Sequence, residues 1–241
     1  MNITWLEKDV VAAEIARRVR PADVILDIGP GIRPQKHVFP LIHICVEPFA
    51  PYIERVREGV GDDPRFVFLN CTWQEGLKTL PDKSVDSVFA LDVIEHLEKD
   101  DGLELLRQAR RVARCQVMVF TPLGYMPQDY DEAGKKDRWG MEGGYWQTHR
   151  SGWEPDDFED DWNFVACRRY HDVDENDRPL DEPTGALWAF LDLSKQDAAE
   201  DTALAAQYRR LRSLYYKRRV RRLLPRRVYT GLQRLKNSLF R

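Results

Sequence analysis

Short apolar runs recur along the first half of the chain and alternate with segments of helical periodicity. The apolar runs lie at residues 23–29, 41–47, 65–70, 84–92 and 115–120. Nearly continuous runs of this length are typical of parallel strands that are buried on both faces. Because the intervening segments have a helical period, the pattern predicts a doubly wound, Rossmann-like α/β sheet that is mostly parallel.

Two of the helical segments are well marked. A helix is expected from Trp5 to Arg20, ending before Pro21. A second is expected at 99–113, and its buried face is predicted to consist of Leu103, Leu106, Ala109 and Ala113.

The pattern changes after the fifth apolar run. Residues 124–153 are polar and rich in aromatic side chains without a clear period, which is typical of a long functional loop. Beyond a helix start at 154–162, the apolar runs 164–171 and 186–193 are joined by a turn-rich segment. We therefore expect an antiparallel strand pair to complete the sheet.

Charge divides the chain into two parts. The net charge is −3, but residues 207–241 carry 13 Lys and Arg and no Asp or Glu. We assign residues 1–206 to the domain and 207–241 to a basic amphipathic helical tail with an apolar stripe. The tail could bind an anionic membrane surface, a nucleic acid backbone or the acidic domain, and the stripe favours the membrane over nucleic acid.

The cysteines and the apolar content indicate the setting of the protein. Cys45, Cys71, Cys115 and Cys167 are widely separated, so they predict neither a disulfide framework nor a metal knuckle. No run of 18 apolar residues and no signal-like N-terminus is present. A cytoplasmic protein is expected, and nothing in the sequence indicates its oligomeric state.

The first strand ends in a glycine turn. The segment "VILDIGPG" places Asp27, Gly29 and Gly31 at the sheet edge where open α/β sheets bind ligands, and Glu47 ends the second strand. Arg33 stands near the place of a third glycine, which disfavours a dinucleotide. The two acids suit S-adenosylmethionine instead, with Asp27 for the ammonium group and Glu47 for the ribose hydroxyls.

Five motifs in order resemble the class I S-adenosylmethionine-dependent methyltransferases, and specifically the methyltransferase-11-like members. The similarity runs from Val24 to Phe158 and comprises "ILDIGPG", "CVE", "LNCTW", "SVDSVFALDVIEHLEK" and "MVFTPLG". The resemblance implies that Gly29 and Gly31 line the methionine part, Glu47 the ribose, and Asp92 the sulfonium. It also implies an adenine edge formed by Cys71, Thr72 and Trp73.

Each of these residues also has a structural alternative. Asp27 could only tie the amides of the turn, Trp73 could belong to the core, and Asp92 could cap a helix that begins at "VIEHL".

Histidines supply the candidates for proton transfer. His96 in "DVIEHLEK" and His149 in "YWQTHRSGW" are the two candidate catalytic residues, because a hydroxyl acceptor must lose a proton. Asp92, Glu95, His96 and His149 also resemble a metal-binding pattern of small-RNA 2′-O-methyltransferases. One further histidine of that pattern is missing, so no metal ligand is predicted.

Aromatic residues of the long loop indicate the acceptor. They are Tyr125, Tyr130, Trp139, Tyr145, Trp146 and Trp153, and Arg138 and Arg150 accompany them. Such a set suits a sugar ring, or alternatively a lid over the cofactor. Because "THRSGW" is similar to a region of methyltransferases of cell-surface polysaccharide synthesis, we expect O-methylation of a small-molecule or glycan acceptor. An RNA methyltransferase and a non-catalytic, cofactor-binding assembly partner are the alternatives.

Overall fold

The computed structural model describes residues 2–130, 136–174 and 178–194. Within these ranges eight strands form one sheet in the order β1-β7-β8-β6-β5-β2-β3-β4. The strands are β1 (Asn2–Trp5), β2 (Val24–Ile28), β3 (Ile42–Val46), β4 (Phe66–Leu69), β5 (Val85–Leu91), β6 (Ala113–Leu123), β7 (Trp162–Val173) and β8 (Pro179–Asp192). The predicted tail at 207–241 and the domain boundary at 206 lie outside the described residues.

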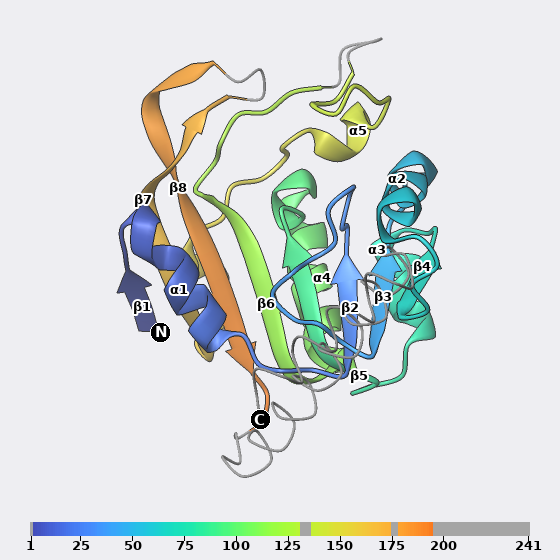
Figure 1. Cartoon of the computed structure of the whole chain (residues 1–241). Helices are drawn as coiled ribbons and strands as arrows, with labels where there is room; N and C mark the ends of the chain where they lie inside the picture. The colour runs from blue at the N-terminus through green and yellow to red at the C-terminus, as the bar shows by residue number, and fades with distance from the viewer. Residues whose placement is uncertain (1, 131–135, 175–177, 195–241) are drawn as a thin grey trace, which may run out of the picture. The chain divides into compact units, whose positions relative to one another are not determined.

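The predicted sheet is confirmed. Strand β8 pairs antiparallel with β6 and with β7, and every other strand pair is parallel. In β2, Ile25 and Leu26 are both fully buried although they point to opposite faces, as expected for a central parallel strand. All strands except β8 therefore run in one direction, and their carboxyl ends meet at one edge (Figure 1).

Helices cover both faces of this sheet. They are α1 (Lys8–Arg18), α2 (Ala50–Val60), α3 (Trp73–Thr79), α4 (Lys99–Val112) and α5 (Gly144–Gln147), with 3₁₀ turns η1 (Ile94–His96) and η2 (Pro155–Asp157). Figure 1 shows α1 in front of the sheet and α4 behind it, while α5 lies beyond the carboxyl ends of the strands. Among the described residues, no helix has the length and apolar content needed to cross a membrane.

Strand β1 and helices α3 and α5 were missed, and one predicted buried face was partly wrong. Strand β1 and helix α3 are short, and a capping box between Thr72 and Glu75 starts α3. Leu103 is exposed, whereas Gly102, one residue earlier and about 100° away around the helix, is buried. The reason is a close contact, since a Cβ atom on Gly102 would lie 2.3 Å from the indole of Trp153.

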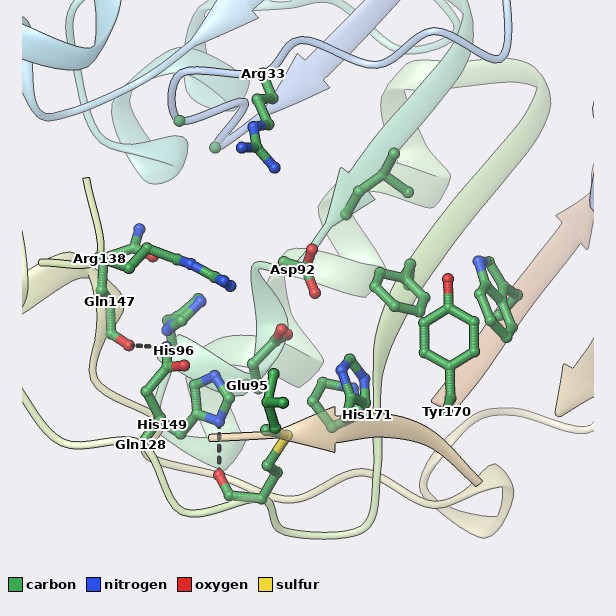
Figure 2. A pocket seen from close by; sticks show the side chains of 18 of the residues that line it. Arg33, Asp92, Glu95, His96, Gln128, Arg138, Gln147, His149, Tyr170 and His171 are labelled. Carbon is green, nitrogen blue, oxygen red and sulfur yellow. Dashed lines mark hydrogen bonds between the residues drawn. The ribbon is translucent and has the colours of Figure 1, made fainter. Parts of the chain in front are cut away.

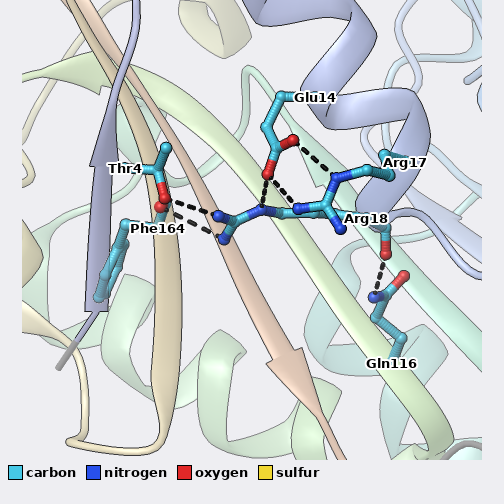
Figure 3. Close-up of polar contacts among 6 residues, drawn as sticks. All are labelled: Thr4, Glu14, Arg17, Arg18, Gln116 and Phe164. Carbon is cyan, nitrogen blue, oxygen red and sulfur yellow. Dashed lines mark hydrogen bonds and ion pairs between the residues drawn. The ribbon is translucent and has the colours of Figure 1, made fainter.

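Polar contacts attach α1 to the strands on which it lies (Figure 3). The Arg18 guanidinium donates to Thr4 Oγ1 of β1 at 2.7 Å and to the Phe164 carbonyl of β7 at 3.4 Å. The amide of Gln116 in β6 donates to the Arg18 carbonyl at 2.9 Å. Helix α1 is thereby fixed beside the carboxyl edge, where Lys8, Val11 and Ile15 become part of a cavity wall.

Candidate functional site

Two adjoining cavities open at the carboxyl edge of the sheet. The smaller has a volume of about 330 Å³ and the larger of about 800 Å³. The residues that line both are Gly29, Gly31, Asp92, His96 and Gln147. A ligand in one cavity can therefore be reached from the other, as a reaction between two bound molecules requires.

The glycine turn forms the boundary between the cavities. Gly29 has φ +58° and Gly31 has φ +52°, in the left-handed region that side chains disfavour. A Cβ atom on Gly29 would also lie 2.9 Å from Cγ2 of Val93. The turn thus brings bare backbone to the cavity surface, which a ligand can approach closely.

Glu47 holds this turn in place. Its carboxylate accepts hydrogen bonds from the Gly31 amide at 3.0 Å and from the Phe49 amide at 2.9 Å. Burial raises the pKa of Glu47 to about 7, although the two amides oppose the rise. Because each carboxylate oxygen has a further lone pair, Glu47 can also accept from ligand hydroxyls in the smaller cavity.

The predicted adenine edge is partly at the smaller cavity. Thr72 and Trp73 line it at the start of α3, and Cys71 lines neither cavity. Trp73 packs in the hydrophobic core at the same time, and its indole Nε1 has no hydrogen-bond partner among the described residues. A buried donor at a cavity wall suits a ligand that offers an acceptor.

Asp27 lies behind the turn and lines neither cavity. Its Oδ2 accepts from the Gln35 amide at 2.8 Å and contacts His43 Nε2 at 2.9 Å. The structure therefore places Asp27 in the turn-tying role and gives no support to a contact with the ligand.

Asp92 borders both cavities in a strained conformation. Its φ is +55°, and the 3₁₀ turn that follows has Val93 at its N-cap without a side-chain cap, so the helix-capping alternative is wrong. Desolvation by the surrounding protein raises the pKa of Asp92 to about 6, and the positive charge of Arg138 opposes the rise. The side chain is nevertheless exposed to the cavity. Strain of this kind is typical of functional positions.

The structure brings Glu95, His96 and His149 together at this boundary (Figure 2). Potential ligand atoms of the three side chains all lie within 4.8 Å of one another. His96 Nδ1 lies 3.2 Å from the Thr148 carbonyl and His149 Nδ1 lies 2.6 Å from the Met126 carbonyl. Both predicted catalytic histidines therefore belong to one cluster, with their ring centroids 4.8 Å apart.

Charge in this cluster is poorly compensated. Glu95 is 2% exposed, and neither carboxylate oxygen has a hydrogen-bond partner among the described residues. Burial and then the negative charge of Asp92 raise the pKa of Glu95 well above its ordinary value, although its own amide, the Thr121 hydroxyl and the Val93 amide oppose the rise. Burial and then His149 lower the pKa of His96 to about 3, so His96 is neutral at neutral pH.

Backbone contacts join the two segments that carry the cluster. The Glu95 carbonyl accepts from the amides of Arg150 at 2.7 Å and Ser151 at 3.1 Å. The Ser151 hydroxyl donates toward the carbonyls of Ile94 and Leu97. Two motifs far apart in the sequence, "VIEHL" and "THRSGW", are thus held in fixed register.

Much of the larger cavity was missed from the sequence. Phe120 of β6, Tyr170 and His171 of β7, and Trp188 of β8 line it, together with residues of α1. The rings of Phe120 and Tyr170 lie 4.7 Å and 5.0 Å from that of Trp188. Their aromatic character was a visible signal, but only the strand order brings them to one wall.

The predicted aromatic loop residues have different positions. Trp139 lines the larger cavity, while Tyr145 and Trp146 line the smaller one. Trp153 is fully buried in the core and Tyr125 is exposed. The set is therefore neither a single sugar platform nor a single lid.

Two arginine side chains bring positive charge to the larger cavity. Arg33 and Arg138 line it, and Figure 2 shows both guanidinium groups directed toward the space in front of Asp92. The loop position of Arg33, where a third glycine was expected, thus supplies a cation at the cavity.

Comparison with known proteins gives a family for the central part of the chain. Residues 26–120 match the family described as a methyltransferase domain. No curated protein matches the chain.

Similar solved structures were also found. An S-adenosylmethionine-dependent methyltransferase from Archaeoglobus fulgidus is 16% identical, with 76% of this chain and 94% of that chain covered and a TM-score of 0.42. A complex of the Haloferax volcanii Trm112 methyltransferase activator with a methyltransferase is 14% identical, with 76% of this chain and 89% of that chain covered and a TM-score of 0.48. Magnesium protoporphyrin IX methyltransferase from Synechocystis PCC 6803 is 13% identical, with 76% of each chain covered and a TM-score of 0.43. All three TM-scores are below 0.5, so only the match of residues 26–120 supports a methyltransferase domain.

Proposed function

We propose that this chain, a class I S-adenosylmethionine-dependent methyltransferase, transfers the methyl group to an oxygen of a sugar or glycan-type acceptor. The cofactor is S-adenosylmethionine, and the smaller cavity is its proposed site. The larger cavity is the proposed acceptor site.

The residues of the smaller cavity fit this cofactor. The glycine turn leaves room for close approach, Glu47 has lone pairs for two hydroxyls, and Trp73 offers an indole donor. S-adenosylmethionine supplies a methyl group on a positively charged sulfur, so an attacking oxygen gains the methyl as the carbon–sulfur bond breaks and its electron pair stays on sulfur. The shared boundary at Gly29 and Asp92 would hold donor and acceptor in reach of each other.

The observation that carries the acceptor proposal is the composition of the larger cavity. Aromatic rings of Tyr170 and Trp188 form one wall, and amides of Gln128 and Gln147 are also in its lining. Aromatic faces pack against the C–H faces of sugars, while amides pair with their hydroxyls. A volume of about 800 Å³ is within the range of pockets for ligands of several rings.

A hydroxyl acceptor must also lose its proton. A carbonyl can only accept, so His149 Nδ1 carries the hydrogen toward Met126 and Nε2 is the basic atom. His96, with its pKa lowered to about 3, is a weak base at neutral pH. We therefore assign the proton-accepting role to His149 when no metal ion is bound.

Product analysis tests the acceptor. The full chain is incubated with methyl-labelled S-adenosylmethionine and, separately, with extracted glycan lipids or RNA, and the products are analysed by mass spectrometry. Label on a sugar oxygen supports the proposal. Label on RNA alone, or on nitrogen or carbon of any product, would overturn it.

A further inference from the structure

We propose that Glu95, His96 and His149 form a binding site for a divalent transition-metal ion where the two cavities meet. The three side chains come from η1 and from the loop before β7, and they converge on one point of the larger cavity (Figure 2). The ligand set is one carboxylate and two imidazoles.

The spacing of the three groups is close to that of a metal centre. Their ligand atoms lie within 4.8 Å of one another. Two atoms that each lie about 2.1 Å from one ion are at most about 4.2 Å apart. A contraction of less than about 1 Å, within the reach of side-chain rotation, would therefore complete the coordination.

The histidines are oriented as metal ligands usually are. Each directs Nδ1 at a backbone carbonyl, His96 at Thr148 and His149 at Met126. Ligating histidines commonly donate their other ring N–H in this way, which fixes the ring and leaves Nε2 as the electron-pair donor.

Glu95 provides an independent indication of a cation. It is 2% exposed, and both of its carboxylate oxygens lack hydrogen-bond partners among the described residues. A buried carboxylate is costly unless it is neutralised, hydrogen-bonded or bound to a metal. Asp92 borders the same space and could add a further oxygen ligand.

A second cluster shows what a structural arrangement of similar residues looks like. Asp27, His43 and Cys45 also lie within 4.8 Å of one another, but Asp27 is hydrogen-bonded to His43 and to the Gln35 amide. None of the three lines either cavity. The unpartnered carboxylate and the access from a cavity distinguish the site at Glu95.

The chemistry of the ligands indicates the class of ion. Two imidazoles with one carboxylate suit Zn²⁺, Co²⁺, Fe²⁺ and Mn²⁺ better than Mg²⁺, which prefers oxygen ligands only. If the acceptor is a hydroxyl, as proposed above, such an ion would bind its oxygen and lower its pKa, with the proton leaving to water. His149 would then act as an ion ligand rather than as the proton acceptor.

Co²⁺ binding tests the site without an acceptor. The chelator-treated full chain is titrated with Co²⁺ and followed by calorimetry and by visible absorption. We expect one ion per chain and a visible band typical of nitrogen and oxygen ligation. Glu95→Gln and His149→Gln should each weaken binding by at least about 100-fold, since even outer-shell changes cost about 10–100-fold.

His37→Gln is the matched control, because His37 lines the larger cavity outside the cluster. It should bind Co²⁺ like the wild type, and all variants should still bind S-adenosylhomocysteine if they are folded. Absence of Co²⁺ binding by the folded wild type, or equal binding by Glu95→Gln, would overturn the proposal and leave Glu95 as a buried neutral acid. Co²⁺ binding without methylation of any glycan would instead contradict only the proposed acceptor.

Discussion

Glu47 and Glu95 are two buried glutamates on the same ligand-binding edge, and their surroundings differ. Glu47 is 3% exposed and accepts from two backbone amides, whereas Glu95 is 2% exposed and its oxygens form no well-aligned hydrogen bond with the described groups. Burial raises the pKa of both. The first carboxylate already has partners from its own fold, and the second depends on a proton or on a bound cation.

The difference separates two kinds of binding region. Around Glu47 the chain is preorganised, because the same amides that satisfy the carboxylate also shape the glycine turn. Around Glu95 the fold leaves an electrostatic cost in place, as functional sites commonly do. Variants on the Glu47 side should thus change cofactor affinity, and variants on the Glu95 side should change turnover.

The largest effect is expected for His149→Ala. Loss of the proton acceptor, or of a ligand to the ion that would lower the pKa of the acceptor hydroxyl, should lower turnover by about 10²–10⁴. Cofactor affinity should stay near that of the wild type. Steady-state kinetics and calorimetry with S-adenosylhomocysteine measure the two quantities, and equal losses in both would mean that His149 only orders its loop.

Glu47→Ala should act on the other side of the comparison. Loss of charge-assisted hydrogen bonds to ribose costs about 1.5–3 kcal/mol, or about tenfold to a hundredfold in affinity. Glu47 also ties Gly31 and Phe49, so circular dichroism should accompany the calorimetry. An unchanged dissociation constant in the folded variant would remove Glu47 from the cofactor site.

Cofactor affinity should depend on pH through Glu47. Its pKa is about 7 in the free protein, and the ionised form accepts hydroxyl hydrogen bonds, so binding favours the deprotonated state. Affinity should therefore fall as the pH drops below 7, by about tenfold between pH 8 and pH 6. Calorimetry across this range on Glu47→Gln supplies the control, since its affinity should lose this dependence.

The smallest effect concerns stability. At pH 8 and without metal, Glu95 must either keep a buried charge or take up a proton on folding, because burial raises its pKa. Glu95→Gln removes this cost and should stabilise the fold by about 1 kcal/mol, raising the melting temperature by about 2–4 °C. Glu47→Gln should lower it instead, because one backbone amide loses its acceptor. A lower melting temperature for both variants in calorimetric scans would show that Glu95 has stabilising contacts after all.

Local patterns predicted most of the sheet but not all of its helices. The five apolar runs and the final antiparallel pair were confirmed, because continuous apolar runs leave few alternatives to buried strands. Strand β1 was missed since four residues carry too little periodicity. Leu103 was wrongly buried because its helical spacing gave no sign that Trp153 packs on the side of Gly102.

The glycine turn and the acid at the end of β3 were determined by the sequence itself. Positive φ angles select glycine locally, and consecutive parallel strands end at the same edge, so Gly29, Gly31 and Glu47 had to lie close together.

The cluster of Glu95, His96 and His149 was decided by the tertiary structure. Its members meet only because the loop before β7 folds back and donates hydrogen bonds to backbone carbonyls of η1, including that of Glu95. The wall of Phe120, Tyr170 and Trp188 likewise exists only because β8 is inserted between β6 and β7. Periodicity tells which residues are buried, but long-range pairing decides which of them face one another.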